Sequence, residues 1–232
     1  ASILYSPANI GLIFFSFPTV IMIQTVAPFY PEMIKKQNIY YRLKFNLLRL
    51  LTNLSVKKAK NVIFISDKAR KELKRYYNLR EESTSLIYHG KSMMFKPDLD
   101  YDYLQKIKQK YNLNEFILYV SNIYGYKNFY ELICAYSLIK DRLNSNLKLV
   151  LVGKSYDNKY TKLLKDAVLN KGMEDRIIFL GHVPYEELPY FYALCRLFVY
   201  PSVCENCPNI LIEAMACGAP VLSSNVEPMP EI

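Results

Sequence analysis

The sequence contains few of the residues from which metal and redox centres are built. Its 232 residues include two histidines, His89 and His182, and five cysteines that show no repeated pairing. Cys204 and Cys207 have the C-x-x-C spacing of metal and redox motifs, but no second cysteine pair and no histidine pair lies nearby. This cysteine usage indicates a reducing compartment, and we expect neither a zinc site nor a redox centre.

A hydrophobic run long enough to cross a bilayer is also missing. Residues 10–23 are apolar, but a glycine, a serine and a proline interrupt them, and the run is too short to span. No signal peptide is visible. The chain starts at Ala1 rather than Met and stops at Ile232 in a loop-like segment, so we interpret it as a fragment. We expect a cytoplasmic protein, with peripheral attachment at the inner face of the membrane as an open alternative.

Acidic residues are scarce in one part of the chain. The formal net charge is +9, and residues 35–80 hold fourteen Lys or Arg against two acids, a local balance of +12. Such a patch can bind phosphate groups, nucleic acid or an anionic membrane surface. No recognition motif for nucleic acid accompanies the charge, so we expect no such partner. A solvated basic face and contact with an anionic membrane remain as the two alternatives.

Apolar runs of strand length alternate with helix-like segments along the chain, half of which is hydrophobic. This alternation predicts an α/β fold with parallel, doubly wound sheets. We expect one unit over residues 1–95, a polar connection at 96–114 and a second unit over 115–232. The predicted strands are 10–17, 19–23, 61–65, 86–88, 115–120, 147–152, 176–180 and 197–200, and the predicted helices are 40–54, 67–77 after a Ser66 cap, 129–143, 158–170 and 185–195.

The predicted helix at residues 40–54 is amphipathic. Its leucines fall on one face, and arginines and asparagines fall on the other. The leucines in question are Leu43, Leu47, Leu50, Leu51 and Leu54.

The clearest chemical signal lies in residues 201–221. A strand at 197–200 ends at Pro201, Pro208 suits the first position of a helix, and Gly218 suits a left-handed C-terminal cap. A helix that starts directly after a strand points backbone N–H groups at the sheet edge, here around residues 206–210. Because nothing in this loop is basic, the backbone and the helix dipole would hold an anion.

Two carboxylates frame this predicted anion site. Glu205 lies in the loop ahead of the helix, and Glu213 lies about a turn and a half inside it. Glu213 is placed to accept hydrogen bonds from a diol, because a glutamate on an otherwise apolar helix face needs a partner. The residues alone leave open the alternative of an exposed glutamate on an amphipathic helix.

The spacing Glu205, seven residues, Glu213, followed by AMACGAPV at residues 214–221, resembles the signature of glycosyltransferase family 4. Members of that family are retaining, nucleotide-sugar-dependent enzymes of the GT-B fold. The resemblance implies that Glu213 binds the ribose hydroxyls of the donor and that Glu205 lies near the transferred sugar as a catalytic residue. The loop residues that would hold the diphosphate and sugar are Asn206, Cys207, Pro208 and Asn209.

A second loop, at residues 120–128, resembles the family segment whose lysine neutralises the donor diphosphate. Gly125 allows a sharp turn there, and Lys127 offers a mobile positive charge. The resemblance makes Lys127 catalytic and places Asn122 in the donor site. The family often has a Gly-Arg pair five residues before the lysine, where this chain has Ser121-Asn122. The leaving-group charge would then rest on Lys127 and on helix N-termini.

Three further positions follow from the resemblance. His182 and Val183 fall where the family contacts the base, largely through the backbone. Gln24 falls on a loop that in the family often carries His-Asp or Gln-Asn, so it is a candidate contact for the acceptor sugar. The alternative is a polar residue that merely ends a strand.

His89 follows a strand and is expected to be structural. The tyrosines at 185, 190 and 192 are expected to pack a helix.

The resemblance therefore implies a GT-B protein with two Rossmann-like domains, of which residues 1–95 are the later part of the acceptor domain and 115–232 most of the donor domain. We expect a retaining glycosyltransferase that moves a sugar from a UDP- or GDP-sugar to a glycan or lipid-linked acceptor. We expect no cofactor and no covalent nucleophile, and we expect metal independence on the premise that the chain has no Asp-x-Asp cluster. A sugar-nucleotide epimerase and a non-enzymatic basic module that binds membranes or polyanions are the alternatives.

Overall fold

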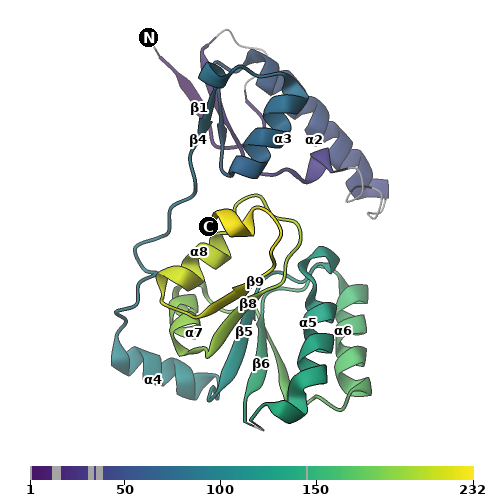
Figure 1. Cartoon of the computed structure of the whole chain (residues 1–232), viewed down its shortest axis with the longest axis vertical. Helices are drawn as coiled ribbons and strands as arrows, with labels where there is room; N and C mark the ends of the chain where they lie inside the picture. Colours follow the sequence, from purple (N-terminus) through teal and green to yellow (C-terminus); the bar gives the residue numbers. More distant parts are fainter. Residues whose placement is uncertain (1, 12–16, 31–33, 35–38, 145) are drawn as a thin grey trace. The chain divides into compact units, whose positions relative to one another are not determined.

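The computed structural model describes residues 2–11, 17–30, 34, 39–144 and 146–232. Contacts divide the chain into two compact units (Figure 1). Unit 1 contains the described residues up to His89 together with the segments Glu205–Cys207 and Glu227–Glu231. Unit 2 contains Gly90–Cys204, Pro208–Val226 and Ile232. Each unit is described separately below.

The described part of unit 1 contains a parallel sheet whose strands stand in chain order. The strands are β1 (Leu4–Ser6), β2 (Thr19–Ile23), β3 (Asn61–Phe64) and β4 (Thr84–Leu86), and they pair as β1-β2-β3-β4. The predictions at 19–23 and 61–65 are confirmed, the second to within one residue. The predicted strand 86–88 is displaced by two residues, and the short β1 was not predicted. Residues 12–16 of the predicted strand 10–17 lie outside the described part of the chain.

Helices α2 (Ile39–Lys58) and α3 (Asp67–Tyr77) accompany this sheet. The core forms where alternate side chains of the strands meet them. Ile23 and Phe64 of the sheet are fully buried with Val56 of α2 and Leu73 of α3. Burying side chains of this size contributes roughly 1.5–3 kcal/mol each to stability.

The face of α2 that lies against the core is not the leucine face. Leu43, Leu47, Leu50 and Leu54 are 63%, 56%, 54% and 40% exposed, whereas Thr52, Ser55 and Val56 are buried. The predicted helix is confirmed, and its leucine face is not the face that meets the core of unit 1. We name the exposed set Ile39, Leu43, Leu47, Leu50 and Leu54 the leucine stripe of α2.

Two residues on the buried face of α2, Thr52 and Ser55, carry hydroxyl groups that find hydrogen-bond partners inside unit 1. Thr52 Oγ1 donates to the Leu48 carbonyl at 2.7 Å, and Ser55 Oγ donates to the Leu51 carbonyl at 2.8 Å. Ser55 Oγ also accepts from the Gly11 amide at 3.0 Å. Because each buried hydroxyl has a partner, burying it carries little penalty.

Among the helices that the structure describes, none has both the length and the apolar character needed to cross a bilayer.

The N-terminus of α3 is capped twice. Ser66 Oγ accepts from the Ala69 amide at 3.2 Å, which confirms the predicted cap. The Glu231 carboxylate accepts from the amides of Asp67 and Lys68 at 2.7 and 2.8 Å. A carboxylate at this end of a helix also interacts favourably with the helix dipole.

Unit 2 contains a parallel sheet in the order β7-β6-β5-β8-β9. Its strands are β5 (Phe116–Val120), β6 (Lys148–Val152), β7 (Ile177–Gly181), β8 (Leu197–Tyr200) and β9 (Val221–Ser223). Its helices are α4 (Tyr101–Lys110), α5 (Phe129–Ile139), α6 (Asn158–Asn170), α7 (Leu188–Leu194) and α8 (Asn209–Ala216). The predicted strands and helices of this unit agree with these bounds to within a few residues, because most of them are apolar runs bounded by polar or turn residues.

The helices of unit 2 cover both faces of its sheet. Figure 1 shows α5 and α6 on one side and α4, α7 and α8 on the other. The strand order requires this arrangement. The chain moves from β5 through β6 to β7 on one side, then crosses back to β8 and β9, and right-handed crossovers place the returning helices on the opposite face.

The predicted connection at residues 96–114 contains α4, which packs on α7 within unit 2. Lys110 Nζ and the Tyr111 hydroxyl donate to the two carboxylate oxygens of Glu187, at 2.7 and 2.6 Å. Burial favours a higher pKa for Glu187, but these two bonds outweigh it and the pKa is lowered. Glu187 is therefore a satisfied buried carboxylate that fastens the end of α4 to the turn before α7.

Candidate active site

The sheet of unit 2 has a topological switch point. Strand β5 has β6 on one side and β8 on the other, and the connections from β5 and β8 run in opposite directions across the sheet. In open α/β sheets, ligands bind beyond the carboxyl ends of the strands at such a point. The loops that leave β5 and β8 are the two motif loops at residues 120–128 and 201–208. Within unit 2, the fold therefore brings the 120–128 loop, the start of the 201–208 loop and helix α8 to one edge of one sheet.

Aromatic rings hold Lys127 at this edge. Its ammonium lies over the rings of Tyr126 and Tyr200, 5.2 and 6.0 Å from their centroids. The Tyr119 hydroxyl donates to the Lys127 carbonyl at 2.7 Å. Because Tyr119 belongs to β5 and Tyr200 to β8, these contacts position Lys127 above two neighbouring strands.

The residue after Lys127 connects the two motif loops. Asn128 has a positive φ of 55° and precedes the first residue of α5. Its side-chain amide donates to the Pro201 carbonyl at 3.0 Å. The turn that presents Lys127 is thus fixed to the start of the 201–208 loop.

A close approach of backbones supports the neighbouring residue Asn122. Gly153, at the end of β6, has φ +146°, and a Cβ built on it would lie 1.9 Å from the Ser121 carbonyl oxygen. Only glycine therefore lets the ends of β5 and β6 approach this closely. Asn122 itself is exposed directly beyond this contact, where the resemblance placed a donor contact.

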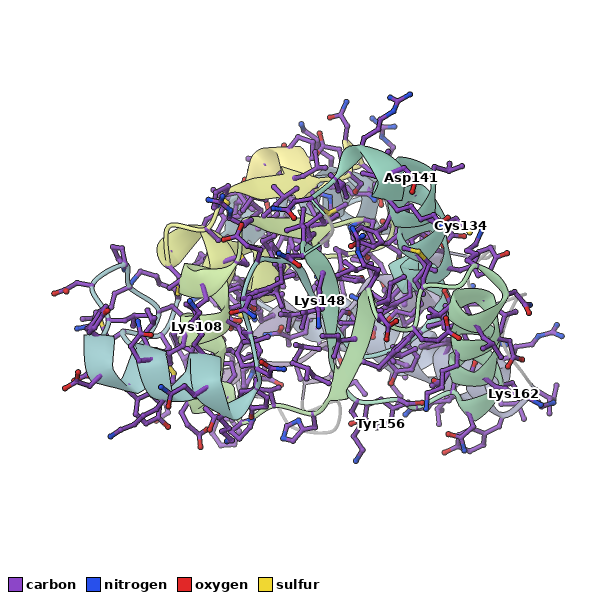
Figure 2. The ribbon with its side chains drawn as sticks, turned by 90° about the horizontal axis from the view of Figure 1, so that it is seen from below. Lys108, Cys134, Asp141, Lys148, Tyr156 and Lys162 are labelled. Atoms are coloured by element: carbon purple, nitrogen blue, oxygen red, sulfur yellow. The ribbon has the colours of Figure 1, made fainter. Side chains whose placement is uncertain are left out.

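Three tyrosines stack along the same loops. Tyr124 lies between Tyr126 and Tyr156, with ring centroids 5.7 Å apart in each pair and interplanar angles of 10° and 5°. A bridge between Ile123 and Ser155 joins the two loop backbones. Figure 2 shows Tyr156 on the outside of unit 2, well away from Lys108 of α4. The sequence reasoning did not single out this stack, which stiffens the segment that carries Lys127.

Helix α8 begins at Asn209, so Pro208 precedes the helix rather than opening it as predicted. The amides of Leu211 and Ile212 donate to the Pro208 carbonyl at 2.9 and 3.2 Å. Gly218, with φ +76°, adopts the left-handed conformation predicted after the helix. Pro208 is buried and Asn209 is exposed, so of these two predicted donor contacts only Asn209 presents a surface.

Glu213 is a buried carboxylate with two tyrosine partners. It is 7% exposed. The Tyr185 hydroxyl donates to Oε1 at 2.7 Å, and the Tyr192 hydroxyl lies 3.5 Å from Oε2. Burial raises the pKa of Glu213, and the two tyrosine hydrogen bonds lower it in part. The alternative of an exposed glutamate on an amphipathic helix is therefore wrong.

The tyrosines of the α7 region do more than pack. Tyr190 packs on Tyr103, with ring centroids 4.8 Å apart, as helix packing predicts. Tyr192 and Tyr185 also bind Glu213 through their hydroxyls, and burial together with this bond raises the pKa of Tyr185 to about 12. Sequence reasoning missed this role because 28 and 21 residues separate the tyrosines from the glutamate.

His182 and Val183 follow β7, which lies at the edge of the sheet and is separated from β5 by β6. Gly181 before them has φ +72°. The His182 side chain is exposed and Val183 is buried. They lie at the same sheet edge as the motif loops, and their role in base contact stays a prediction.

The remaining predicted site residues belong to unit 1, where Asn206 and Gln24 lie together. The Asn206 side-chain amide donates to the carbonyls of Ile23 and Gln24 at 2.9 and 3.1 Å. Asn206 Oδ1 accepts from the Ser66 hydroxyl at 2.9 Å. Because these bonds occupy the Asn206 side chain, any donor contact from this residue would come from its backbone. The Gln24 side chain is exposed directly after β2.

Glu205 and Cys207 flank Asn206 and are partly exposed. Burial raises the pKa of the Cys207 thiol, although a backbone hydrogen bond involving His89 lowers it in part. A thiol with a raised pKa is a poor nucleophile and a poor metal ligand.

The premise that the chain has no Asp-x-Asp cluster is wrong, because this spacing occurs outside both motif loops, at Asp98, Asp100 and Asp102. The structure gives its central residue a local role, because Asp100 Oδ1 accepts from the Tyr103 amide at 2.7 Å and caps α4. Across residues 2–11, 17–30, 34, 39–144 and 146–232, no three His, Cys, Asp or Glu side chains gather in a way that could hold a metal ion.

The two parallel sheets with helices around them are the GT-B arrangement, which solved structures share. HepE from Anabaena, crystallised with UDP, superposes with a TM-score of 0.76 at 23% identity, covering 99% of this chain and 61% of that one. WaaG, a glycosyltransferase involved in lipopolysaccharide biosynthesis, superposes with a TM-score of 0.76 at 20% identity, covering 97% and 60%. At this level of identity, the likeness establishes the fold.

Sequence comparison establishes the family. The family Glycosyl transferases group 1 matches residues 101–232, more than half of the chain, and the chain belongs to it. O-antigen chain mannosyltransferase B of Escherichia coli is 34% identical over 180 residues, which cover 77% of this chain and 46% of that protein. O-antigen chain mannosyltransferase RfbU of Salmonella typhimurium is 28% identical over 212 residues, covering 91% and 53%. The chain thus spans about half the length of these two relatives.

Proposed function

We propose that this chain is the core of a retaining glycosyltransferase that transfers a sugar from a nucleotide-diphosphate sugar to a glycan or lipid-linked acceptor. One observation carries the proposal. Lys127 lies in the loop that leaves β5, and the helix that bears Glu213 follows the loop that leaves the neighbouring strand β8, at the switch point of unit 2. Membership in the glycosyltransferase family supports it.

The proposed chemistry divides among a few groups. Lys127 and the N-terminus of α8 would stabilise the negative charge that develops on the departing diphosphate, which is the main barrier in an oxocarbenium-like transfer. Glu213 would accept hydrogen bonds from the ribose hydroxyls. Glu205 would lie near the sugar. We propose neither a metal ion nor a covalent intermediate for this reaction.

The donor we propose is a UDP- or GDP-sugar. HepE has been crystallised with UDP-glucose, and several curated relatives are named as mannosyltransferases. O-antigen in the names of two relatives supports a polysaccharide or lipid-linked glycan as acceptor.

Titration calorimetry of the full-length protein with UDP and GDP tests the site. We expect Lys127→Ala and Glu213→Ala each to weaken nucleoside diphosphate binding at least about tenfold, because each removes a charge-assisted contact in a partly buried site. Lys162→Ala and Glu174→Ala are the matched controls, since both side chains are exposed and lie on α6 and just beyond it. Unchanged affinity in both site variants would remove the proposed site.

An assay with a donor sugar and no acceptor separates transfer from epimerisation. Transfer predicts that the sugar nucleotide is recovered intact or slowly hydrolysed until a glycan acceptor is added. Appearance of an isomerised sugar nucleotide without an acceptor would replace the proposed function by that of an epimerase.

We also propose that unit 1 contacts an anionic membrane surface. The leucine stripe of α2 is exposed, and Arg42, Lys44, Lys57 and Lys58 lie on the same helix. An apolar stripe beside basic residues is the pattern of helices that lie in the interface of anionic bilayers. Flotation of the full-length protein with anionic vesicles tests this proposal, and failure to float would remove it.

A further inference from the structure

The carboxylate proposed to receive the donor ribose is covered in the structure. Glu213 is 7% exposed, and Tyr185 and Tyr192 place their hydroxyls on its two oxygens. Because so little of Glu213 is exposed, we expect ribose hydroxyls to reach it only after one of these partners moves. The two tyrosines differ sharply in their freedom to do so.

Tyr192 is fixed. It is fully buried, and its ring packs against Phe198 and Phe95, with centroids 5.4 and 6.1 Å away. Its hydroxyl lies 3.5 Å from Oε2, the longer of the two contacts. A buried ring in a close-packed core turns only if its neighbours move as well.

Tyr185 is less enclosed than Tyr192. It is 49% exposed and opens the short 3-10 turn η5 (Tyr185–Glu187) that leads into α7. One edge of its ring touches Phe95, with centroids 5.3 Å apart, and its hydroxyl bonds Glu213 Oε1 at 2.7 Å. Rotation of this side chain into solvent would uncover Oε1 and give up the edge contact with Phe95, while the ring of Tyr192 keeps its packing.

We propose that Tyr185 is a positioning residue that latches Glu213 in the ligand-free protein and yields Oε1 to the vicinal diol of the donor ribose. The inference rests on the proposed function and adds a determinant of specificity to it. A ligand that displaces the Tyr185 hydroxyl from Glu213 binds well only if it offers Oε1 a new hydrogen-bond donor. A ribose hydroxyl replaces the lost hydrogen bond, whereas a dideoxyribose would leave a buried carboxylate oxygen without a partner, which is unfavourable.

The test compares Tyr185→Phe with the unaltered full-length protein by titration calorimetry, using UDP or GDP, whichever binds, and its 2′,3′-dideoxy analogue. Removing the hydroxyl takes away the bond that the ribose must displace. We expect the diphosphate with an intact ribose to bind roughly threefold to tenfold more tightly to the variant. The dideoxy analogue should show a much smaller gain, because it cannot use the released oxygen.

Two further variants keep the result interpretable. Tyr190→Phe removes a hydroxyl from the neighbouring helix, where the ring packs on Tyr103, and should leave both affinities unchanged. Tyr185→Leu removes the hydroxyl with a different side chain and should reproduce the gain if Tyr185→Phe folds poorly.

The outcomes separate the two proposals. Nucleotide binding that is unchanged or weaker in both Tyr185 variants would overturn the latch while leaving the proposed function in place, since the hydroxyl would then support the bound state or play no part. An equal gain for the dideoxy analogue would also overturn it. Absence of nucleotide binding to every protein would overturn the proposed function and the latch together.

Discussion

Glu213 shows what one buried carboxylate does to the stability of the fold. In water the carboxylate is well solvated, but in unit 2 it is almost fully buried, and burial raises its pKa above the ordinary value of 4.5. The folded protein therefore binds a proton at this site more readily than the unfolded chain does. By linkage, this residue makes the protein less stable as the pH rises from the ordinary glutamate value through the raised folded value.

Substitution of Glu213 by Gln tests this account. Glutamine keeps the shape and an oxygen that accepts from Tyr185, and it cannot ionise. We expect Glu213→Gln to gain stability over the unaltered protein as the pH rises from 4 to 7, measured by urea unfolding at each pH. Glu174→Gln, at an exposed position, should show no such trend. A stability difference that does not change with pH would contradict the role assigned to burial.

The position of a site residue in a loop or helix could be predicted where it depends on a short stretch of sequence. The partners of that residue could not be predicted, because they come from distant parts of the chain. The helix after β8, the left-handed Gly218, the Ser66 cap and the position of Lys127 in a strand-to-helix loop all follow from short stretches. The partners of these groups come from elsewhere in the chain. Tyr185, Tyr200 and Asn128 acquire their roles only when the strands are ordered, and no spacing in the sequence indicates that order.

At the scale of elements, the positions of helices and strands were predicted better than their orientations. The sequence of α2 correctly indicates a helix, but its buried face carries Thr52, Ser55 and Val56 instead of leucines. Periodicity shows that two faces differ, and by itself it does not show which face meets the core. The hydroxyl bonds of Thr52 and Ser55 to the helix backbone give these buried polar groups their partners on that face.

The close approach of the backbones at the ends of β5 and β6 leads to a prediction for Gly153. Gly153→Ala would place a Cβ 1.9 Å from the Ser121 carbonyl oxygen at a φ of +146°. We expect a loss of about 1–3 kcal/mol in the free energy of unfolding, together with weaker nucleotide binding, because the strand ends that support Lys127 must separate. Chemical denaturation and calorimetry measure the two effects.

Gly125→Ala is the matched control for that change. Gly125 lies in the Lys127 turn, but a Cβ there meets nothing within 4 Å and its φ is not positive. Its stability should stay within about 0.5 kcal/mol of the unaltered protein. If Gly153→Ala is as stable as Gly125→Ala, the close approach of the backbones has no energetic importance.

For the whole molecule, charge and apolar surface coincide on unit 1. Residues 35–80 carry a local balance of +12 within a net charge of +9, and the leucine stripe lies in the same segment. Basic residues contribute about 1 kcal/mol each near an anionic surface, and each inserted leucine contributes roughly 1.5–3 kcal/mol. Both contributions would act together at a membrane.

We expect a double variant, Leu47→Ser with Leu50→Ser, to lower the affinity of the full-length protein for anionic vesicles at least about tenfold in a sedimentation assay. The control pair, Leu138→Ser with Leu169→Ser, removes leucines that are 83% and 61% exposed on unit 2, and should bind normally. Added salt should weaken the binding of every variant. Equal binding by the two pairs would show that the stripe does not face the membrane, and the solvated basic face would stand instead.

The double capping of α3 has a consequence for the order in which the protein is made. Glu231, near the end of this chain, supplies the carboxylate that accepts from the first amides of a helix that begins at Asp67. Roughly 160 residues of synthesis separate the two groups, and the whole sheet of unit 2 is translated in between. Unit 1 therefore lacks this cap while the sheet of unit 2 is being translated, and it can acquire the cap only after Glu231 has been synthesised.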